Sequence, residues 1–110
     1  MNKPMSFSNA LISLKLGRLV AREGWNGKGM FLFLVAGSTF TVNRAPLLGI
    51  FPEGTSIDYL PHIDMRTAQG TVVPWMASQT DILADDWLVI ELAPDRAVPG
   101  DGGTVADHPA

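Results

Sequence analysis

A histidine and an aspartate stand two positions apart in the segment HIDMRT, at His62 and Asp64. Alternate residues of a β-strand project from the same face, so this spacing would place the two side chains side by side. Such a pair can act as a general base or supply two metal ligands, but it also occurs as a purely structural pair. A metal site needs a third ligand, and the only other histidine is His108, near the C-terminus. We therefore assign no catalytic residue, metal or cofactor from this motif.

Other enzyme motifs are missing from the sequence. There is no cysteine and no Gly-x-Ser-x-Gly nucleophile motif, and GWNGKG lacks the spacing and the final Gly-Lys-Ser/Thr of a phosphate-binding P-loop. An enzymatic alternative, a phosphodiesterase or glycohydrolase, would have to rely on His62, Asp64 and Asp81. We expect a protein that is not an enzyme.

Two tryptophans in polar surroundings favour ligand binding instead. Trp25 lies in the segment GWNGKG and Trp75 ends the segment TVVPW, whereas Trp87 opens the apolar segment WLVIEL and is expected in the core. A single loop tryptophan is as often a packing lid as a ligand platform. Two of them favour a flat aromatic ligand, since an indole stacked on a base contributes about 1–3 kcal/mol.

Polar side chains close to these tryptophans in the sequence suit the rest of a nucleotide. Lysine and arginine can meet phosphates, and arginine offers a bidentate fork. Amides and hydroxyls can bind ribose hydroxyls or base edges, and a carboxylate can accept from a hydroxyl or an exocyclic amine. Taken one by one, Arg44 and Arg66 are better explained as solvated surface charges, and Asp81 as part of the cap of the late helix. The predicted ligand-binding set is Trp25, Asn26, Lys28, Asn43, Arg44, Asp64, Arg66, Trp75, Ser78, Gln79, Thr80 and Asp81.

Composition limits the class of protein. The chain has 110 residues, 46% of them hydrophobic, which fits one globular domain. The net charge is −3, and residues 67–110 carry seven acids against one arginine, so a nucleic-acid polymer is not the expected partner. A small anionic ligand needs only a few local cations. No apolar run is long enough to span a membrane and no secretion signal is recognisable, so we expect a cytoplasmic protein with no membrane partner.

The elements that must position these residues follow from periodicity and turn signals. Residues 6–17 predict an amphipathic helix, capped by Ser6 or Ser8 and ended by Gly17. Ser78 predicts the cap of a short helix within 78–86, and residues 37–39 suggest a turn. The connections are too short for parallel crossovers, so we expect an α+β domain over residues 1–92 with a small, mainly antiparallel sheet. Strands are expected at 18–23, 30–35, 40–43, 62–67, 71–75 and 87–92.

Two segments fit neither helix nor strand. Residues 45–55, APLLGIFPEGT, hold apolar side chains between two prolines, and a second subunit or the chain's own core must cover them. If a host target covers them instead, the protein would be a docking module, a third alternative beside a ligand-binding protein and an enzyme. Residues 93–110 are rich in proline and glycine and are expected to form a disordered tail.

Four longer segments carry a resemblance to a known family. They are VAREGWNGKGMFLFLV, VNRAPLLGIFPEGT, HIDMRTAQGTVVPW and ASQTDILADDW. In this order they resemble a small phage and prophage family, the second type of Thoeris anti-defence protein, and the resemblance extends over about residues 6–92. Segments of this length are much more specific than a three-residue motif.

The resemblance implies a function of sequestration. Thoeris defence uses TIR-domain proteins that convert NAD into a cyclic ADP-ribose isomer, which activates a cell-killing effector. Members of the family bind this glycocyclic ADP-ribose without degrading it, as homotetramers with pockets between subunits, and some also bind cyclic di- or oligonucleotides at a separate site. For this chain, the resemblance implies that Trp25 and Trp75 stack on the base, that Arg44 or Arg66 meets the pyrophosphate, and that the 45–55 loop lies at a subunit interface.

Overall fold

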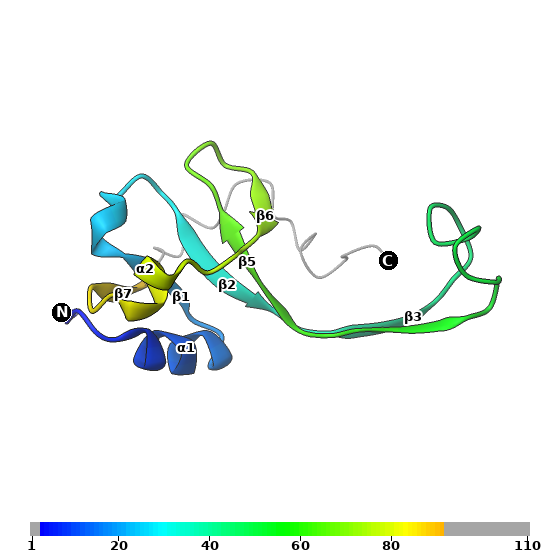
Figure 1. The fold of residues 1–110 in the computed structure, drawn as a ribbon, viewed down its shortest axis with the longest axis horizontal. Coiled ribbons are helices and arrows are strands. Elements are labelled where there is room, and N and C mark those ends of the chain that lie inside the picture. Colours follow the sequence, from blue (N-terminus) through cyan, green and yellow to red (C-terminus); the bar gives the residue numbers. More distant parts are fainter. Residues whose placement is uncertain (1–2, 92–110) are drawn as a thin grey trace. The chain divides into compact units, whose positions relative to one another are not determined.

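The computed structural model describes residues 3–91, and the predicted tail at 93–110 lies outside this part of the chain. The fold is α+β with antiparallel strand pairing, as the sequence predicts. Figure 1 shows the order of the elements. They are α1 (Phe7–Lys15), β1 (Leu19–Arg22), a 3₁₀ turn η1 (Glu23–Trp25), β2 (Phe31–Val35), β3 (Ser38–Thr41), β4 (Ser56–Tyr59), β5 (His62–Arg66), β6 (Val72–Pro74), α2 (Gln79–Leu83) and β7 (Trp87–Ile90).

The chain divides into two compact units. The first contains residues 3–36 and 61–91 and holds a five-stranded sheet in the order β6-β5-β2-β1-β7. The strand β2 is central in this sheet, as expected of a strand that is apolar on both faces. Its partner β5 pairs from Phe31 opposite Arg66 to Val35 opposite His62. In the described residues, neither helix is long and apolar enough to cross a membrane.

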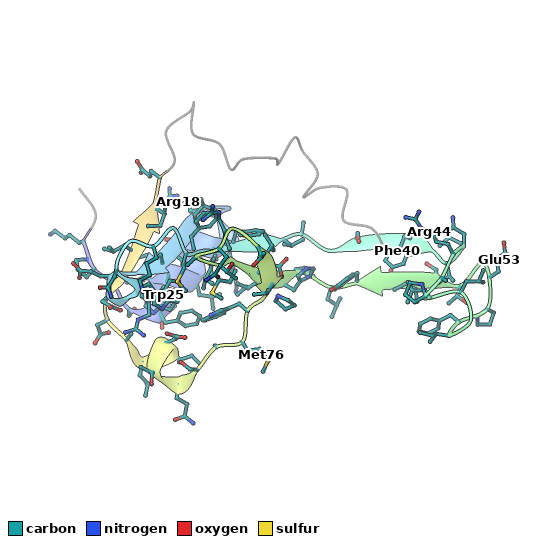
Figure 2. The ribbon with its side chains drawn as sticks, turned by 90° about the horizontal axis from the view of Figure 1, so that it is seen from above. Arg18, Trp25, Phe40, Arg44, Glu53 and Met76 are labelled. Carbon is teal, nitrogen blue, oxygen red and sulfur yellow. The ribbon has the colours of Figure 1, made fainter. Side chains whose placement is uncertain are left out.

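The second unit, residues 37–60, is a two-stranded hairpin of β3 and β4 with a long loop between them. Among the described residues of this unit, Val42 is the one whose side chain is fully buried. Backbone hydrogen bonds of Val42 with Thr55 and Gly54 close the base of the loop. Arg44 and Glu53 lie in the loop region of this unit (Figure 2). A hairpin of two strands is marginally stable by itself, so the second unit depends on further packing.

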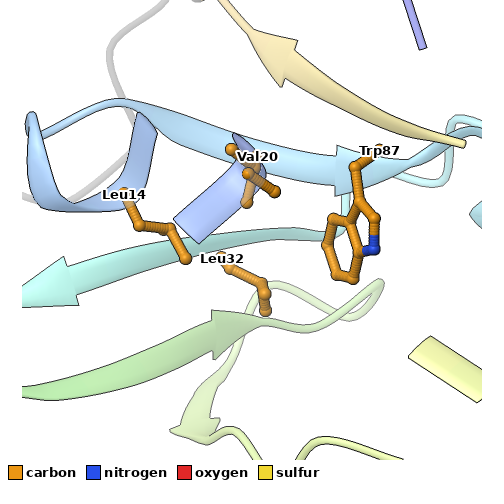
Figure 3. Close-up of a cluster of buried hydrophobic side chains, with 5 residues drawn as sticks. Leu14, Val20, Leu32 and Trp87 are labelled. Atoms are coloured by element: carbon orange, nitrogen blue, oxygen red, sulfur yellow. The ribbon is translucent and has the colours of Figure 1, made fainter. Parts of the chain in front are cut away.

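The core of the first unit lies between α1 and one face of the sheet (Figure 3). Ser6 caps α1 by accepting from the Asn9 amide, and Gly17 follows its end with a φ of +87°, as predicted. The spacing of apolar residues on α1 turns one side of the helix toward β1, β2 and β7. The fully buried cluster is Ala10, Leu14, Val20, Leu32 and Trp87.

The two faces of the sheet carry different side chains. Ile63 and Met65 of β5 pack against the core cluster, so the alternating residues Asp64 and Arg66 lie on the opposite face. This alternation matters for function because it separates the predicted ligand-binding residues of β5 from both half-buried tryptophans.

Three details of the predicted elements are wrong. The turn expected at 37–39 is absent, because Ser38 and Thr39 already pair with β4. As a result β3 begins two residues before the predicted strand at 40–43, and β4 itself was not predicted. The late helix, by contrast, lies within 78–86 as predicted; it ends at Leu83, since Ala84 is extended and Asp86 turns back to bond Arg22 and Gly24.

Candidate functional site

A groove beside Trp75 is the candidate ligand site of the first unit. Its volume is about 600 Å³, within the range of small-molecule sites. The walls are mostly apolar, with Lys15 from the end of α1 and His62 from the start of β5 as the titratable groups. The lining residues are Leu11, Lys15, Leu34, Pro61, His62, Ile63, Trp75 and Ala77.

Both predicted tryptophans are anchored on the buried Trp87. Trp25 meets Trp87 edge to face at 5.4 Å between ring centroids and 77°, and Trp75 does so at 6.1 Å and 87°. Phe7 lies 5.9 Å from Trp75 and 5.4 Å from Trp87. Both indoles are half-buried, so each combines a packing role with a partly accessible surface. Trp87 is fully buried, as the sequence predicts.

The start of α2 follows Trp75 closely in the chain. Ser78 caps this helix by accepting from the Asp81 amide, which confirms the predicted cap. Gln79 and Thr80 are exposed. The side chain of Asp81 forms an ion pair with Arg22 at 2.8 Å, and its carbonyl accepts a 2.9 Å bond from Trp87 Nε1. One carboxylate oxygen of Asp81 is thus already engaged.

Arg22 is a central residue of this region that the sequence reasoning missed. Its Nε donates to Asp86 Oδ1 and its Nη1 to Asp81 Oδ1, both at 2.8 Å. Asp86 Oδ2 also accepts from the Gly24 amide at 2.9 Å. The hydrogen bond from Arg22 lowers the pKa of the Asp86 carboxyl below its ordinary range, and the Gly24 amide adds to this effect. The sequence signal was an arginine directly after the apolar residues 19–21, inside the expected strand 18–23.

The predicted residues of β5 lie on the other face of the sheet. Asp64 is buried, and its Oδ2 is 3.9 Å from Nε2 of His62, which agrees with the predicted side-by-side placement. Arg66 donates from Nη1 to the carbonyl of Gly29 at 2.8 Å and lies over the ring of Phe31 at 5.9 Å. These contacts fasten Arg66 to the turn before β2.

The remaining predicted residues are exposed and fall in two places. Asn26 and Lys28 occupy the turn between η1 and β2, where Asn26 has a left-handed φ of 62°. Asn43 and Arg44 belong to the second unit, where they line a cavity of about 580 Å³. One chain therefore distributes the twelve residues over both faces of the sheet and over both units.

Within residues 3–91, no group of three or more histidine, aspartate or glutamate side chains could hold a metal ion. His62 and Asp64 form a pair without a third acidic or histidine ligand in this part of the chain. Asp81, the third residue of the enzymatic alternative, is paired with Arg22. The described geometry does not assemble these three side chains into one centre.

Comparison with known proteins decides the family. The sequence model of the Thoeris anti-defense 2-like domain matches residues 5–90. The chain belongs to this family. It is also similar to the protein named Thoeris anti-defense 2 of Bacillus phage SP01, with 38% identity over 90 residues, covering 82% of this chain and 99% of that protein. Membership of the Thoeris anti-defense 2-like family supports a phage anti-defence role, and the family description suggests inhibition rather than catalysis.

Proposed function

We propose that this protein binds glycocyclic ADP-ribose, the cyclic ADP-ribose-type signal made by TIR proteins of Thoeris defence, and sequesters it without cleaving it. The observation that carries the proposal is the groove walled by Trp75, in a chain that belongs to the Thoeris anti-defense 2-like family. Such a protein would act in the cytoplasm of the bacterial host, where the signal is made.

The chemistry of the groove fits an adenine better than a pyrophosphate. Its wall of apolar side chains suits the faces of a flat base, and stacking on Trp75 contributes about 1–3 kcal/mol. Lys15 at the groove can attract one phosphate charge. Ser78, Gln79 and Thr80 follow three to five residues after Trp75, and we propose that they bind ribose hydroxyls.

A complete site is proposed to need a second subunit. The sheet separates Asp64 and Arg66 from Trp75 within one chain, and Asn43 and Arg44 belong to the other unit. A pocket between subunits can combine such groups and remove most of the ligand surface from water. We therefore propose a homotetramer whose subunits contact each other through the apolar 45–55 loop.

Effective sequestration requires a high affinity for the signal. The protein must compete with the effector that the signal activates, so a nanomolar Kd, or about −12 kcal/mol, is expected. Titration calorimetry with glycocyclic ADP-ribose should show such binding. A titration that releases no heat, together with a Tm that the ligand does not raise, would contradict the proposal and favour the protein-docking alternative.

A release experiment separates sequestration from catalysis. The protein is incubated with a substoichiometric amount of glycocyclic ADP-ribose, denatured by heat, and the ligand is analysed by mass spectrometry. Recovery of the intact ligand is the expected result. Recovery of a linear or hydrolysed product would establish an enzyme, and the His62→Ala variant would then show whether His62 is responsible.

The cavity of the second unit favours one further candidate ligand class. Arg44 and Asn43 line it together with Phe40, so a cation, an amide and an aromatic ring meet around about 580 Å³. Cyclic di- or oligonucleotides are the proposed ligands. If they bind there, saturating glycocyclic ADP-ribose should not displace them. Arg44→Ala should weaken the binding of the cyclic nucleotides but not that of glycocyclic ADP-ribose.

A further inference from the structure

Arg22 joins segments that are distant in the sequence. It ends β1 and lies directly opposite the buried Trp87 in the pairing of β1 with β7. Its two carboxylate partners come from α2 and from the residue just before β7, 59 and 64 positions away. A guanidinium is the side chain suited to this task, because its planar fork can donate to two acceptors at fixed angles.

Arg22 and its two carboxylate partners form a cluster with two arms, the contacts made through Asp86 and those made through Asp81. The Asp86 arm fixes the turn that carries Trp25. Arg22 Nε and the Gly24 amide donate to the two oxygens of the same carboxylate, and the Glu23 amide donates to the Asp86 carbonyl at 2.9 Å. Gly24 suits this position because a Cβ there would lie 3.1 Å from Asp86 Oδ2. Trp25 is the next residue, so this arm sets where its indole meets Trp87.

The Asp81 arm fixes the short helix α2. A helix of five residues does not hold together by its own hydrogen bonds in water. Asp81 lies in its first turn and is bound by Arg22 through its side chain and by Trp87 through its carbonyl. The arm therefore holds the start of α2, and with it Ser78–Thr80, against the same tryptophan.

We propose that Arg22 is a positioning residue for ligand capture, which holds both Trp25 and the start of α2 against Trp87. This inference rests on the proposed function, because it assigns Arg22 a task at the same site. Arg22 touches no ligand in this scheme. It acts through Asp81 and Asp86, whose bonds hold the turn of Trp25 and the start of α2 in position.

The test compares Arg22→Lys with Arg18→Lys. Lysine keeps the charge but cannot bond both carboxylates with the geometry of the fork, and the exposed Arg18 lies four residues earlier (Figure 2). Calorimetry with glycocyclic ADP-ribose should show affinity weakened about tenfold for Arg22→Lys, the effect of losing one charged hydrogen bond. Arg18→Lys should bind like the parent. Equal binding by Arg22→Lys and the parent would overturn the proposal.

Two further measurements distinguish positioning from a general loss of stability. Binding is repeated at a temperature at which both variants are fully folded by circular dichroism, and a loss of affinity that disappears there would overturn the proposal. Acrylamide quenching is then measured in a Trp75→Phe background, where Trp25 and the buried Trp87 remain. Arg22→Lys should increase the quenching of Trp25, and unchanged quenching would also overturn the proposal.

The quenching experiment uses no ligand, so the two levels of the argument can fail separately. A parent protein that binds no glycocyclic ADP-ribose contradicts the proposed function. Increased quenching in Arg22→Lys would still support the structural part of the inference in that case. Asp86→Asn should reproduce this increase more strongly than Asp81→Asn, because only Asp86 bonds the turn that carries Trp25, and the reverse order would contradict the assignment of the arms.

Discussion

Two tryptophans of similar sequence context differ in what surrounds them. Both rings pack against Trp87, but Trp75 also lines the groove of the first unit, whereas Trp25 ends a 3₁₀ turn and is not among the groove's lining residues. Replacing either tryptophan removes packing against Trp87, but of the two only Trp75 also offers a surface in the groove. Trp75 is the position where a substitution reports most directly on the ligand.

Trp75→Ala should weaken the binding of glycocyclic ADP-ribose by about tenfold or more, since stacking on an indole contributes about 1–3 kcal/mol. Titration calorimetry measures the change, and circular dichroism checks the fold. The matched control is Met76→Ala, because Met76 is the next residue and is 87% exposed (Figure 2). If Trp75→Ala bound like the control, the groove would not be the base-binding site.

The Asp86 carboxyl should make stability depend on pH. Arg22 and the Gly24 amide lower its pKa in the folded protein, so its contribution is present above the unfolded pKa of about 3.9 and is lost as the pH falls toward the lower folded value. The Tm difference between the parent and Asp86→Asn should therefore shrink below about pH 4.

Thermal unfolding followed by circular dichroism between about pH 7 and pH 2 tests this dependence. Asp85→Asn removes the same charge from the exposed neighbouring position and serves as the control. A Tm difference for Asp86→Asn that stayed constant over the whole range would show that the pair with Arg22 does not stabilise the fold.

Sequence reasoning identified residue types better than their contacts. Trp87 was placed in the core and Ser78 at a helix cap because each follows from local pattern alone. Arg22 was missed because its partners lie 59 and 64 residues away, and no local pattern encodes such a distance. For the same reason Asp81 was counted as a free acceptor, although it is paired with Arg22.

At the scale of elements, the turn between η1 and β2 depends on glycine. Gly27 and Gly29 have φ values of +65° and +80°, where a residue with a Cβ is strained by about 1–2 kcal/mol. They differ in their surroundings. A Cβ on Gly29 would lie 2.9 Å from Arg66 Nη1, whereas a Cβ on Gly27 would meet nothing within 4 Å.

Gly29→Ala should therefore destabilise the protein more than Gly27→Ala. Both substitutions place a Cβ at a residue with a left-handed φ, which strains the backbone. The methyl group added by Gly29→Ala would also displace the guanidinium of Arg66, which donates to the carbonyl of Gly29, at a further cost of about 1 kcal/mol. Urea unfolding of the two variants measures the difference. Equal losses of unfolding free energy would mean that Arg66 does not brace this turn.

Elements with a strong internal pattern were predicted closely, whereas the hairpin of β3 and β4 was not. The helix α1 and the central strand β2 match their expected ranges within two residues. The strand β4 was missed because SIDY has neither strong alternation nor a clear boundary, and its pairing with β3 is what makes it a strand. That pairing also overrides the turn propensity of Gly37, Ser38 and Thr39.

At the scale of the whole molecule, the arrangement of polar residues and the exposed apolar loop lead to the same expectation. Asp64 and Arg66 alternate along β5 with the residues that pack on the core, so they lie on the face of the sheet opposite the one on which Trp75 packs. The second unit, for its part, is a two-stranded hairpin, which requires outside packing for stability. Assembly of several copies would meet both requirements at once.

The loop of the second unit offers the sharpest test of this assembly. Ile50 is 69% exposed, and Leu48 and Phe51 on either side are also exposed, an arrangement that costs free energy unless a partner covers it. Ile50→Asp should shift the protein from the proposed homotetramer to smaller species, because a buried unpaired carboxylate strongly disfavours an interface. Light scattering coupled to size-exclusion chromatography measures the mass directly.

Glu53→Lys changes a charge in the same loop (Figure 2) and should keep the parent's mass. A tetramer that survived Ile50→Asp would exclude this loop as the interface, and a monomeric parent would mean that the groove beside Trp75 has to work within a single chain.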